Sequence, residues 1–375
     1  MRKRILITST DLMMIQFLVP HVIHFSENGF EVEIACSDVG GRMEEIREKL
    51  KDYVKMIHVV RLVRSPVSLK NLTGYQDTKK VISNGNYDII WTNEPVMGVA
   101  TRLAARKARR NGTKVVYMVH GFHFFDGAPK LNWMIYYPIE KAISRVTDMI
   151  VTINREDYQR AKKMYAKDVR YIHGIGVNTS RLQKSSEQKN IRAEIGVTRK
   201  DFLILSVGEL NENKNHKVVI RSLGKMQDPT IHYVICGKGE QLQDLQNIAE
   251  EEKVLDKVHF MGYRKDVVDI CSQVDLFAFP SQREGLGLAA LEAMYCGLAL
   301  VTSRIRGLVD IMDDGISGFL CDPNNVDEWA EAIKTLKNNY KLRQDAGLHN
   351  QKKSFLYCIE ETQKEVLDLF KEVKY

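Results

Sequence analysis

The sequence lacks the cysteine and hydrophobic patterns that mark secreted, metal-binding and membrane-spanning proteins. None of its six cysteines forms a C-x-x-C pair, and no histidine stands at zinc-finger spacing. This pattern indicates free thiols in a reducing compartment. No stretch of about 18 apolar residues occurs, so we expect no membrane-spanning helix. The apolar run after the basic start is short and is typical of a first buried strand, not of a signal peptide. We therefore expect a cytoplasmic protein.

Glycine is missing where the common nucleotide-binding motifs need it. No G-x-x-x-x-G-K-[ST] segment is present, and no G-x-G-x-x-G follows the first expected strand. The loop after that strand, residues 9–14, contains no glycine at all. These absences argue against a P-loop enzyme and against a dinucleotide-binding dehydrogenase.

Basic residues are unevenly distributed along the 375-residue chain. The first 173 residues carry 28 Lys and Arg against 18 Asp and Glu, whereas the remaining residues carry 27 against 30. Such asymmetry predicts either an anionic partner for the first half, such as a membrane surface, or simply a solvated basic face. Within it, Arg102, Arg106, Arg109 and Arg110 have helical spacing and would share one face. The aromatic residues of segment 122–137 are compatible with a core or with an interfacial patch.

Strand and helix patterns alternate through the chain in two series, and the polar stretch Gln183–Lys189 is the best candidate for the linker between them. Continuous apolar runs such as 114–119 are typical of parallel strands that are covered on both faces. The fold class is therefore α/β, with two Rossmann-like doubly wound parallel-sheet domains facing across a cleft. We expect an N-terminal domain over 1–178 and a C-terminal domain over 179–350. A C-terminal helix over 351–375 could pack back on the first domain. The expected strands are 4–8, 31–35, 55–62, 88–92, 114–119 and 148–153 in the first series, and 201–207, 230–236, 257–261, 275–280 and 299–303 in the second.

The segment that carries the most chemistry is E-G-L-G-L-A-A-L-E, from Glu284 to Glu292. Gly285 and Gly287 allow close approach of the backbone to a ligand. The amides of Gly287, Leu288 and Ala289 would point out of a helix N-terminus, which is a ready site for an anion. Carboxylates on either side suit the hydroxyl groups of a sugar or a ribose. By spacing alone, two surface glutamates around an ordinary helix start remain an equal alternative.

This segment resembles the E-x7-E element of the family 4 retaining glycosyltransferases, which have the GT-B fold, and other marks of that family occur in the right order from about residue 4 to about residue 340. G-E-L-N-E-N-K at 208–214 resembles the family's G-[RE]-L-x-x-x-K segment. V-H-G at 119–121 resembles its [TV]-H-[GD] strand end, and D-M-I-V-T-I-N at 148–154 resembles its D-x-I-[VI]-x-x-S strand. Val177-Asn178 resembles the linker mark G-V-D.

The resemblance implies a role for each matching position. Glu284 would hold the hydroxyls of the donor sugar, Glu292 the ribose of the nucleotide, and Lys214 the leaving diphosphate. His120 would reach from the first domain toward the transferring sugar, so that His120, Glu284 and Lys214 form the expected catalytic set. The expected donor-binding residues are Gly208, Glu209, Gly237, Arg264, Gly285, Leu286, Gly287, Leu288, Ala289 and Glu292. On the acceptor side we assign Thr10, Asp11 and His123.

Two positions keep alternatives open. Many family members have Arg where this chain has Glu209, and an acidic residue near a diphosphate is unfavourable unless it is paired. Glu209 would pair with Lys214 or Arg283, or would bind sugar hydroxyls. His120 at a strand end is by position alone more often structural than catalytic.

No D-x-D triplet occurs, although glycosyltransferases of the GT-A type usually use one to hold a metal ion. Lys214 and helix amides would stabilise the negative charge of the diphosphate instead. We therefore expect no metal and no cofactor, since the nucleotide sugar is a substrate.

The resemblance thus implies transfer of a hexose or N-acetylhexosamine from a nucleotide sugar, UDP in preference to GDP, with retention. The acceptor would be a glycan or a polyprenyl-diphosphate-linked glycan in capsule or exopolysaccharide biosynthesis. We expect peripheral contact of the basic N-terminal domain with the inner face of the plasma membrane, and no nucleic acid partner. Two alternatives remain: a UDP-sugar 2-epimerase of the same fold and a non-catalytic nucleotide-sugar-binding protein.

Overall fold

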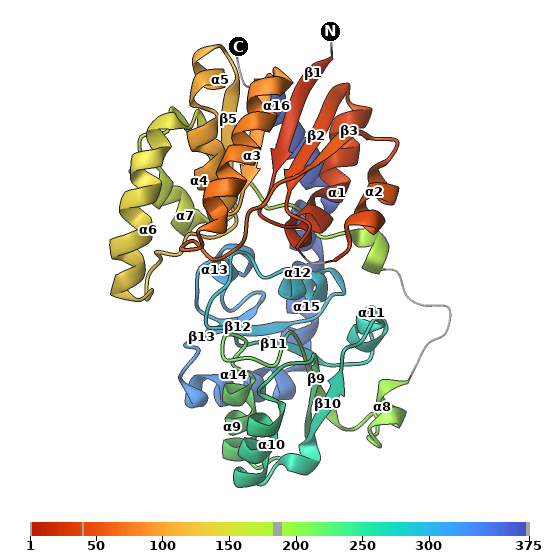
Figure 1. Cartoon of the computed structure of the whole chain (residues 1–375). Helices are drawn as coiled ribbons and strands as arrows, with labels where there is room; N and C mark the ends of the chain where they lie inside the picture. Colours follow the sequence, from red (N-terminus) through yellow and green to blue (C-terminus); the bar gives the residue numbers. More distant parts are fainter. Residues whose placement is uncertain (1, 40, 183–189, 373–375) are drawn as a thin grey trace. The chain divides into compact units, whose positions relative to one another are not determined.

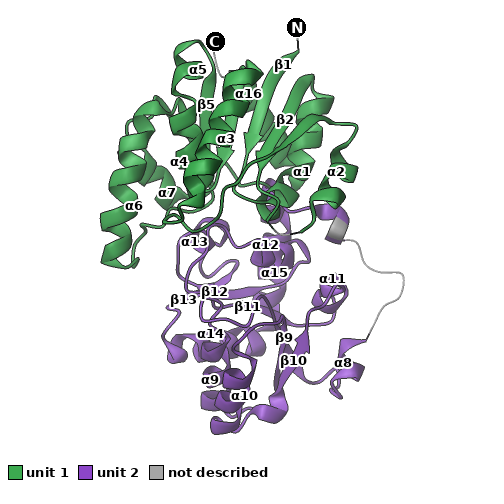
Figure 2. Ribbon diagram, viewed as in Figure 1, with its two compact units in different colours: residues 1–176, 359–375 green, residues 177–358 purple. Residues whose placement is uncertain are grey.

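The computed structural model describes residues 2–39, 41–182 and 190–372, and the expected linker Gln183–Lys189 lies outside these ranges. The chain divides into two compact units (Figure 2). Unit 1 comprises Met1–Gly176 and Ile359–Tyr375, and unit 2 comprises Val177–Cys358. The chain therefore passes from unit 1 into unit 2 and returns, and its last helix belongs to unit 1. Within the described ranges, no helix is long and apolar enough to span a lipid bilayer.

Unit 1 is built on a seven-stranded sheet with the order β3-β2-β1-β4-β5-β6-β7, in which every neighbouring pair is parallel (Figure 1). The last of these strands, β7, was not predicted from the sequence. The strands are β1 (Lys3–Thr8), β2 (Phe30–Cys36), β3 (Val54–Val59), β4 (Ile89–Asn93), β5 (Lys114–Val119), β6 (Met149–Thr152) and β7 (Asp168–Tyr171). The helices are α1 (Leu12–Glu27), α2 (Met43–Leu50), α3 (Lys70–Gly85), α4 (Pro95–Ala104), α5 (Arg106–Arg110), α6 (Lys130–Ile143), α7 (Arg155–Ala161) and α16 (Ile359–Glu372).

Successive side chains of the strands of unit 1 pack on opposite faces of its sheet, as the period of a strand requires. Ile90 belongs to the buried cluster under α3 and α4. Its neighbour Trp91 packs edge-on against Phe25 of α1 and Phe370 of α16, with ring centroids 5.7 and 5.3 Å away. The C-terminal helix thus completes the core of unit 1.

Unit 2 contains a six-stranded parallel sheet with the order β10-β9-β8-β11-β12-β13 (Figure 1). The last strand, β13, was again missed by the sequence patterns. The strands are β8 (Phe202–Val207), β9 (Ile231–Cys236), β10 (Val258–Gly262), β11 (Leu276–Phe279), β12 (Leu300–Ser303) and β13 (Gly318–Cys321). The helices are α8 (Ile191–Glu194), α9 (His216–Met226), α10 (Leu242–Glu251), α11 (Val267–Cys271), α12 (Leu288–Tyr295), α13 (Leu308–Ile311), α14 (Val326–Asn338) and α15 (Tyr340–Ser354).

The predicted cationic face of residues 102–110 was wrong. These arginines do not lie on one continuous helix, because the helical segment breaks at Ala105 into α4 and α5. Arg102 is fully buried, and its Nη2 donates to Oε2 of Glu140 at 2.8 Å. Arg109 pairs with Asp148 at 2.8 Å. An arginine can be buried when a carboxylate neutralises it, and spacing on a helix cannot reveal such a partner.

The aromatic segment 122–137 is mainly core, which decides between its two interpretations. Phe122 and Phe124 are buried and stack on each other with centroids 4.6 Å apart. Trp133 and Tyr137 of α6 pack against Phe124, with ring centroids 5.6 and 5.3 Å away. The large hydrophobic side chains of α6 that remain exposed are aliphatic instead: Leu131, Met134, Ile135 and Ile139.

Candidate active site

The candidate donor site of unit 2 lies at the topological switch point of its sheet, where the order of the strands along the chain reverses. Strand β8 has β9 on one side and β11 on the other. Helices that follow these strands diverge at such a point and leave room for a ligand beyond the carboxyl ends of the strands. The loop 208–215 follows β8, and the loop 280–287 follows β11. These loops carry most of the residues that the sequence predicts for the donor.

Lys214 and Glu284 meet across this switch point. The Nζ of Lys214 lies 2.6 Å from Oε1 of Glu284, and both side chains are largely buried. The Nζ also lies 4.6 Å from the ring centroid of Phe279. The aliphatic part of Lys214 covers Gly208, where an added Cβ would lie 3.3 Å from the lysine side chain. A cation is thereby held against the carboxyl edge of the sheet.

Asparagine side chains fix the two loops to each other. The Nδ2 of Asn213 donates to the carbonyl oxygen of Arg283 at 3.1 Å, and the carbonyl of Asn213 accepts from the amide of Gln282 at 2.7 Å. Asn215 is buried in a left-handed conformation, and its Nδ2 donates to the carbonyl of Pro280 at 3.1 Å. The positions of Lys214 and Glu284 are therefore set by backbone contacts as well as by their own ion pair.

The first turn of α12 offers amide donors next to this pair. Gly287 precedes the helix with φ of +90° and, as a glycine, has no side chain with which to cap α12. The amides of Ala290 and Leu291 bond to the carbonyl of Gly287, whereas those of Leu288 and Ala289 come earlier in the turn, where a helix leaves its donors for a ligand. The predicted residues Gly285, Leu286 and Glu292 lie on the same loop and helix.

Gly237 is required by packing beside the same loop. It follows β9, and a Cβ at this position would lie 1.7 Å from the carbonyl oxygen of Gly208. Only glycine permits this approach of the two strand ends. The structure therefore gives Gly237 a role in shaping the loop that carries Lys214.

Glu209 does not pair with Lys214, because Glu284 occupies that lysine. The side chain of Glu209 is exposed and accepts a hydrogen bond from Nδ2 of Asn211 at 2.8 Å. Its carbonyl contacts Nε2 of His216 at 3.3 Å. His216 is buried, and desolvation lowers its pKa to about 4.

Arg264 is already held by two carboxylates. It pairs with Asp266 at 2.7 Å and with Glu194 at 2.6 Å, and hydrogen bonds from these partners raise its pKa. Its neighbour Tyr263 is 69% exposed. In this segment Tyr263 therefore offers an exposed ring, whereas the guanidinium of Arg264, predicted to bind the donor, is already engaged by carboxylates.

One charged residue of this site was missed by sequence reasoning. Arg306 is 7% exposed, and its Nε lies 3.3 Å from the carbonyl oxygen of Glu284. The adjacent Gly307 has φ of +80° and packs its Cα face against Gly285, where a Cβ would lie 2.7 Å from the carbonyl oxygen. The sequence feature that could have identified Arg306 is the arginine–glycine pair that it forms with Gly307 shortly after β12.

Unit 1 has a polar cluster at its own switch point, between β1 and β4. Thr10 and Asp11, predicted for the acceptor side, follow β1. Asp11 caps α1 by accepting from the amide of Met13 and forms an ion pair with Arg64. Glu94, which sequence reasoning missed, follows β4 and accepts from Ser9 Oγ at 2.7 Å and from the amide of Thr10 at 2.9 Å.

Glu94 also has an unusual backbone and an unusual acidity. Its φ of +65° is rarely adopted by a residue with a side chain, and strained residues of this kind concentrate at functional sites. Burial raises the pKa of Glu94, although hydrogen bonds from Ser9 and Thr10 act in the opposite direction. The sequence feature that could have identified Glu94 is its position as a carboxylate between the end of a strand and Pro95.

The two predicted histidines of unit 1 have different surroundings. His120 follows β5, and its Nε2 lies 3.0 Å from Oδ1 of Asn93. Desolvation lowers the pKa of His120 to about 4, so the ring is neutral at neutral pH. The ring of His123 lies against Tyr136 with centroids 4.7 Å apart. A neutral His120 can share a hydrogen bond with a sugar hydroxyl but supplies no positive charge.

In the part of the chain that the structure describes, no three His, Cys, Asp or Glu side chains gather in a way that could hold a metal ion. Metal independence stays a prediction, because activity has to be measured to test it.

Known proteins match both halves of the chain. Residues 21–181 match the family described as Glycosyltransferase Family 4, and residues 187–353 match the family described as Glycosyl transferases group 1. A protein named as a glycosyltransferase, EpsD of Bacillus subtilis (strain 168), is 36% identical over 99% of this chain and 97% of its own length. The UDP-Gal:alpha-D-GlcNAc-diphosphoundecaprenol alpha-1,3-galactosyltransferase of Escherichia coli is 27% identical over 81% of this chain and 79% of its own length.

Solved structures share the fold. The HepE protein of Anabaena, determined in complex with UDP and glucose, has a TM-score of 0.79 with 18% identity and covers 99% of this chain and 100% of its own. Sucrose-phosphate synthase of Thermosynechococcus elongatus has a TM-score of 0.78 with 16% identity, over 99% of each chain. With these two Rossmann-like units and the full-length likeness to EpsD, the chain belongs to the family 4 glycosyltransferases and is a transferase of the GT-B fold.

Proposed function

We propose that this glycosyltransferase transfers a hexose or N-acetylhexosamine from a UDP-sugar to a lipid-linked glycan, with retention, in the biosynthesis of a cell-surface polysaccharide. The observation that carries the donor half of the proposal is the Lys214–Glu284 pair beside the glycine that begins α12. The E. coli relative is named for a UDP-galactose donor and a diphosphoundecaprenol acceptor. HepE binds UDP and UDP-glucose in its crystals.

The chemistry fits the charges of the site. The bond between the anomeric carbon and the β-phosphate oxygen breaks, and its electron pair leaves with UDP. The acceptor hydroxyl oxygen forms the new bond to that carbon, and its proton passes to an oxygen of the departing diphosphate. Lys214 and the first amides of α12 stabilise the negative charge that builds on the diphosphate. Glu284 holds the donor sugar by its hydroxyls and favours the positive character at the anomeric carbon.

We also propose that unit 1 contacts an anionic membrane surface, from which the enzyme takes its acceptor. The support is the basic excess of residues 1–173 together with the exposed aliphatic stripe of α6, which includes Leu131 and Met134. Lys and Arg near an anionic leaflet contribute about 1 kcal/mol each. Co-sedimentation with anionic vesicles at low salt, reduced by charge reversal at Arg106 and Arg110 and by added salt, is the expected result. Equal binding to neutral vesicles, or none, contradicts it.

The test of the enzymatic proposal combines a thermal-shift screen of nucleotide sugars with mass spectrometry of the products. We expect UDP and one UDP-sugar to raise the melting temperature, and transfer to a diphosphate-linked glycan to proceed in EDTA. Lys214→Met should abolish transfer, whereas Lys225→Met, at a surface lysine of the same unit, should not. A C2-epimerised sugar formed without acceptor, or binding without turnover, contradicts the proposal.

A further inference from the structure

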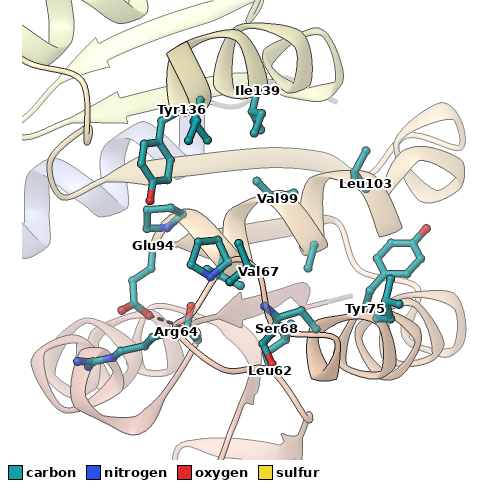
Figure 3. Close-up of a pocket in the computed structure, with 18 of the residues that line it drawn as sticks. Leu62, Arg64, Val67, Ser68, Tyr75, Glu94, Val99, Leu103, Tyr136 and Ile139 are labelled. Carbon is teal, nitrogen blue, oxygen red and sulfur yellow. Dashed lines mark hydrogen bonds between the residues drawn. The ribbon is translucent and has the colours of Figure 1, made fainter. Parts of the chain in front are cut away.

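Unit 1 contains a groove of about 900 Å³ between the segment 62–72, helix α4 and helix α6 (Figure 3). Its size lies within the range of about 300–1,000 Å³ that is usual for small-molecule sites. The apolar side chains that face the groove come from four segments: Leu62 and Val67 of the loop before α3, Tyr75 of α3, Val99 and Leu103 of α4, and Ile139 of α6. We call this cavity the apolar groove.

Two of the polar side chains along the apolar groove, Glu140 and Asn71, are already used by the fold. Glu140 accepts from Arg102 at 2.8 Å and from the hydroxyl of Tyr117 at 3.3 Å. Asn71 accepts from the amide of Val63 and donates to the carbonyl of Ser65. A sugar placed here would lose its hydrogen bonds to water and gain few from the protein. The lining therefore favours a hydrocarbon ligand.

One end of the groove is polar. Arg64 and Glu94 lie together at this end, whereas Leu103 and Tyr75 lie at the other (Figure 3). The Arg64 side chain is 57% exposed and pairs with Asp11. The groove is therefore polar at one end and apolar at the other, which matches an amphiphile rather than a uniformly apolar ligand.

The rims of the groove are apolar and cationic. On one side Val67 and Leu69 are more than four-fifths exposed, and on the other Ile135 and Ile139 of α6 are nearly half exposed. Arg64 at the rim pairs with Asp11, and Glu94 and Glu140 also line the groove. The exposed Lys70 and Lys130 form no ion pair with a described residue, and they leave the rims a positive charge. This charge suits an amphiphile whose head is anionic.

We propose that the apolar groove binds the hydrocarbon chain next to the phosphate of a phospholipid-type glycosyl acceptor, with its phosphate at the Arg64 end. This inference rests on the proposed function, which supplies the class of acceptor. The chain would leave the bilayer for the groove and so fix the distance between the phosphate and the sugar that receives the transferred residue.

Titration of the full-length protein with three anions tests the inference. Farnesyl diphosphate should bind at least about tenfold more tightly than isopentenyl diphosphate, whose chain is a third as long, because added buried methylenes strengthen binding. Inorganic diphosphate should bind most weakly. Equal affinities for all three would overturn the proposal.

Val99→Phe, which fills the groove, should weaken farnesyl diphosphate binding by about tenfold or more and leave UDP binding unchanged. Val59→Phe makes the same substitution at a half-exposed valine of unit 1 outside the groove and should change neither. An unaltered farnesyl diphosphate affinity in Val99→Phe sinks the assignment. A concentration-dependent dimer that only Val99→Phe abolishes sinks it too, since a second copy would then occupy the groove.

The same samples separate this inference from the proposed function. If transfer from a UDP-sugar proceeds while chain length has no effect on binding, only the groove assignment fails. If no UDP-sugar is bound or turned over while farnesyl diphosphate binds through Val99, the donor proposal fails and the groove remains a site for an anionic lipid.

Discussion

Lys214 and Glu284 are 70 positions apart in the sequence, yet they form a 2.6 Å ion pair in a largely buried setting. A buried pair costs desolvation on both partners, so its retention at a switch point favours a functional over a stabilising role. Glu284 neutralises the lysine in this pair. A bound diphosphate would compete for the same cation and leave the carboxylate to the sugar hydroxyls.

Substitution of the two glutamates tests this division of labour. Glu284→Gln should lower kcat on the order of 10²-fold and leave UDP affinity equal or higher, because Lys214 loses its competing carboxylate. Glu292→Gln should weaken UDP binding more than it lowers kcat. Steady-state kinetics and UDP titration measure both effects, with Glu251→Gln at an exposed position of α10 as the control. Near-normal kinetics in both variants would contradict the assigned roles.

The buried histidines predict a loss of stability in acid. Desolvation lowers the pKa of His21 from 6.5 to about 4, and its Nε2 lies 2.9 Å from the carbonyl of Ile175. Between about pH 6.5 and pH 4 the unfolded chain binds a proton at this residue that the folded chain does not, so stability falls as the pH falls.

His21→Gln should therefore reduce the difference in unfolding free energy between pH 7 and pH 4.5, by on the order of 2 kcal/mol. Urea denaturation at the two pH values measures it. An unchanged difference would mean that this histidine is not the titrating group.

At the scale of elements, the alternation of strands and helices allowed most of the fold to be predicted. The strands β7 and β13 were not predicted, because each has four residues and lies at the edge of its sheet, where the apolar run is shortest. Of the site, Lys214 and Glu284 could be predicted because each lies in a motif with fixed spacing. Glu94 and Arg306 could not, since a single charged residue at a strand end has no periodic partner. The predicted exposure of Arg102 was wrong, because its buried partner Glu140 lies on another helix and cannot be recognised from helical spacing.

The start of α12 should be sensitive to a single methyl group. Gly287 has φ of +90°, and a Cβ there would lie 2.6 Å from Leu308. Gly287→Ala should weaken UDP binding by about tenfold or more, because both strain and contact would displace the amides that face the diphosphate. Gly196→Ala is the matched control: its φ is +71°, but nothing lies within 4 Å of its Cβ. Equal losses of UDP affinity in the two variants would point to general destabilisation instead.

At the scale of the whole molecule, the two units differ in how many segments of the chain build them. Unit 2 is one continuous stretch, Val177–Cys358, whereas unit 1 is completed by α16 from the far end of the sequence. The residues proposed to bind the donor, Lys214, Glu284 and Glu292, all belong to unit 2. Damage to the last helix should therefore affect unit 1 and leave nucleotide binding intact.

Phe370 is the residue through which this can be tested. It is fully buried and packs on Phe25 and Trp91 with ring centroids 5.1 and 5.3 Å away. Phe370→Ala should destabilise unit 1 by about 3–5 kcal/mol, because it removes a buried aromatic ring and leaves a cavity. Calorimetry should show one transition shifted to lower temperature and a second that UDP still raises. Phe355→Ala, at a phenylalanine that is 53% exposed, should shift neither transition. If Phe370→Ala lowers both transitions together and removes UDP binding, the two units unfold as one cooperative body and the donor site depends on the C-terminal helix.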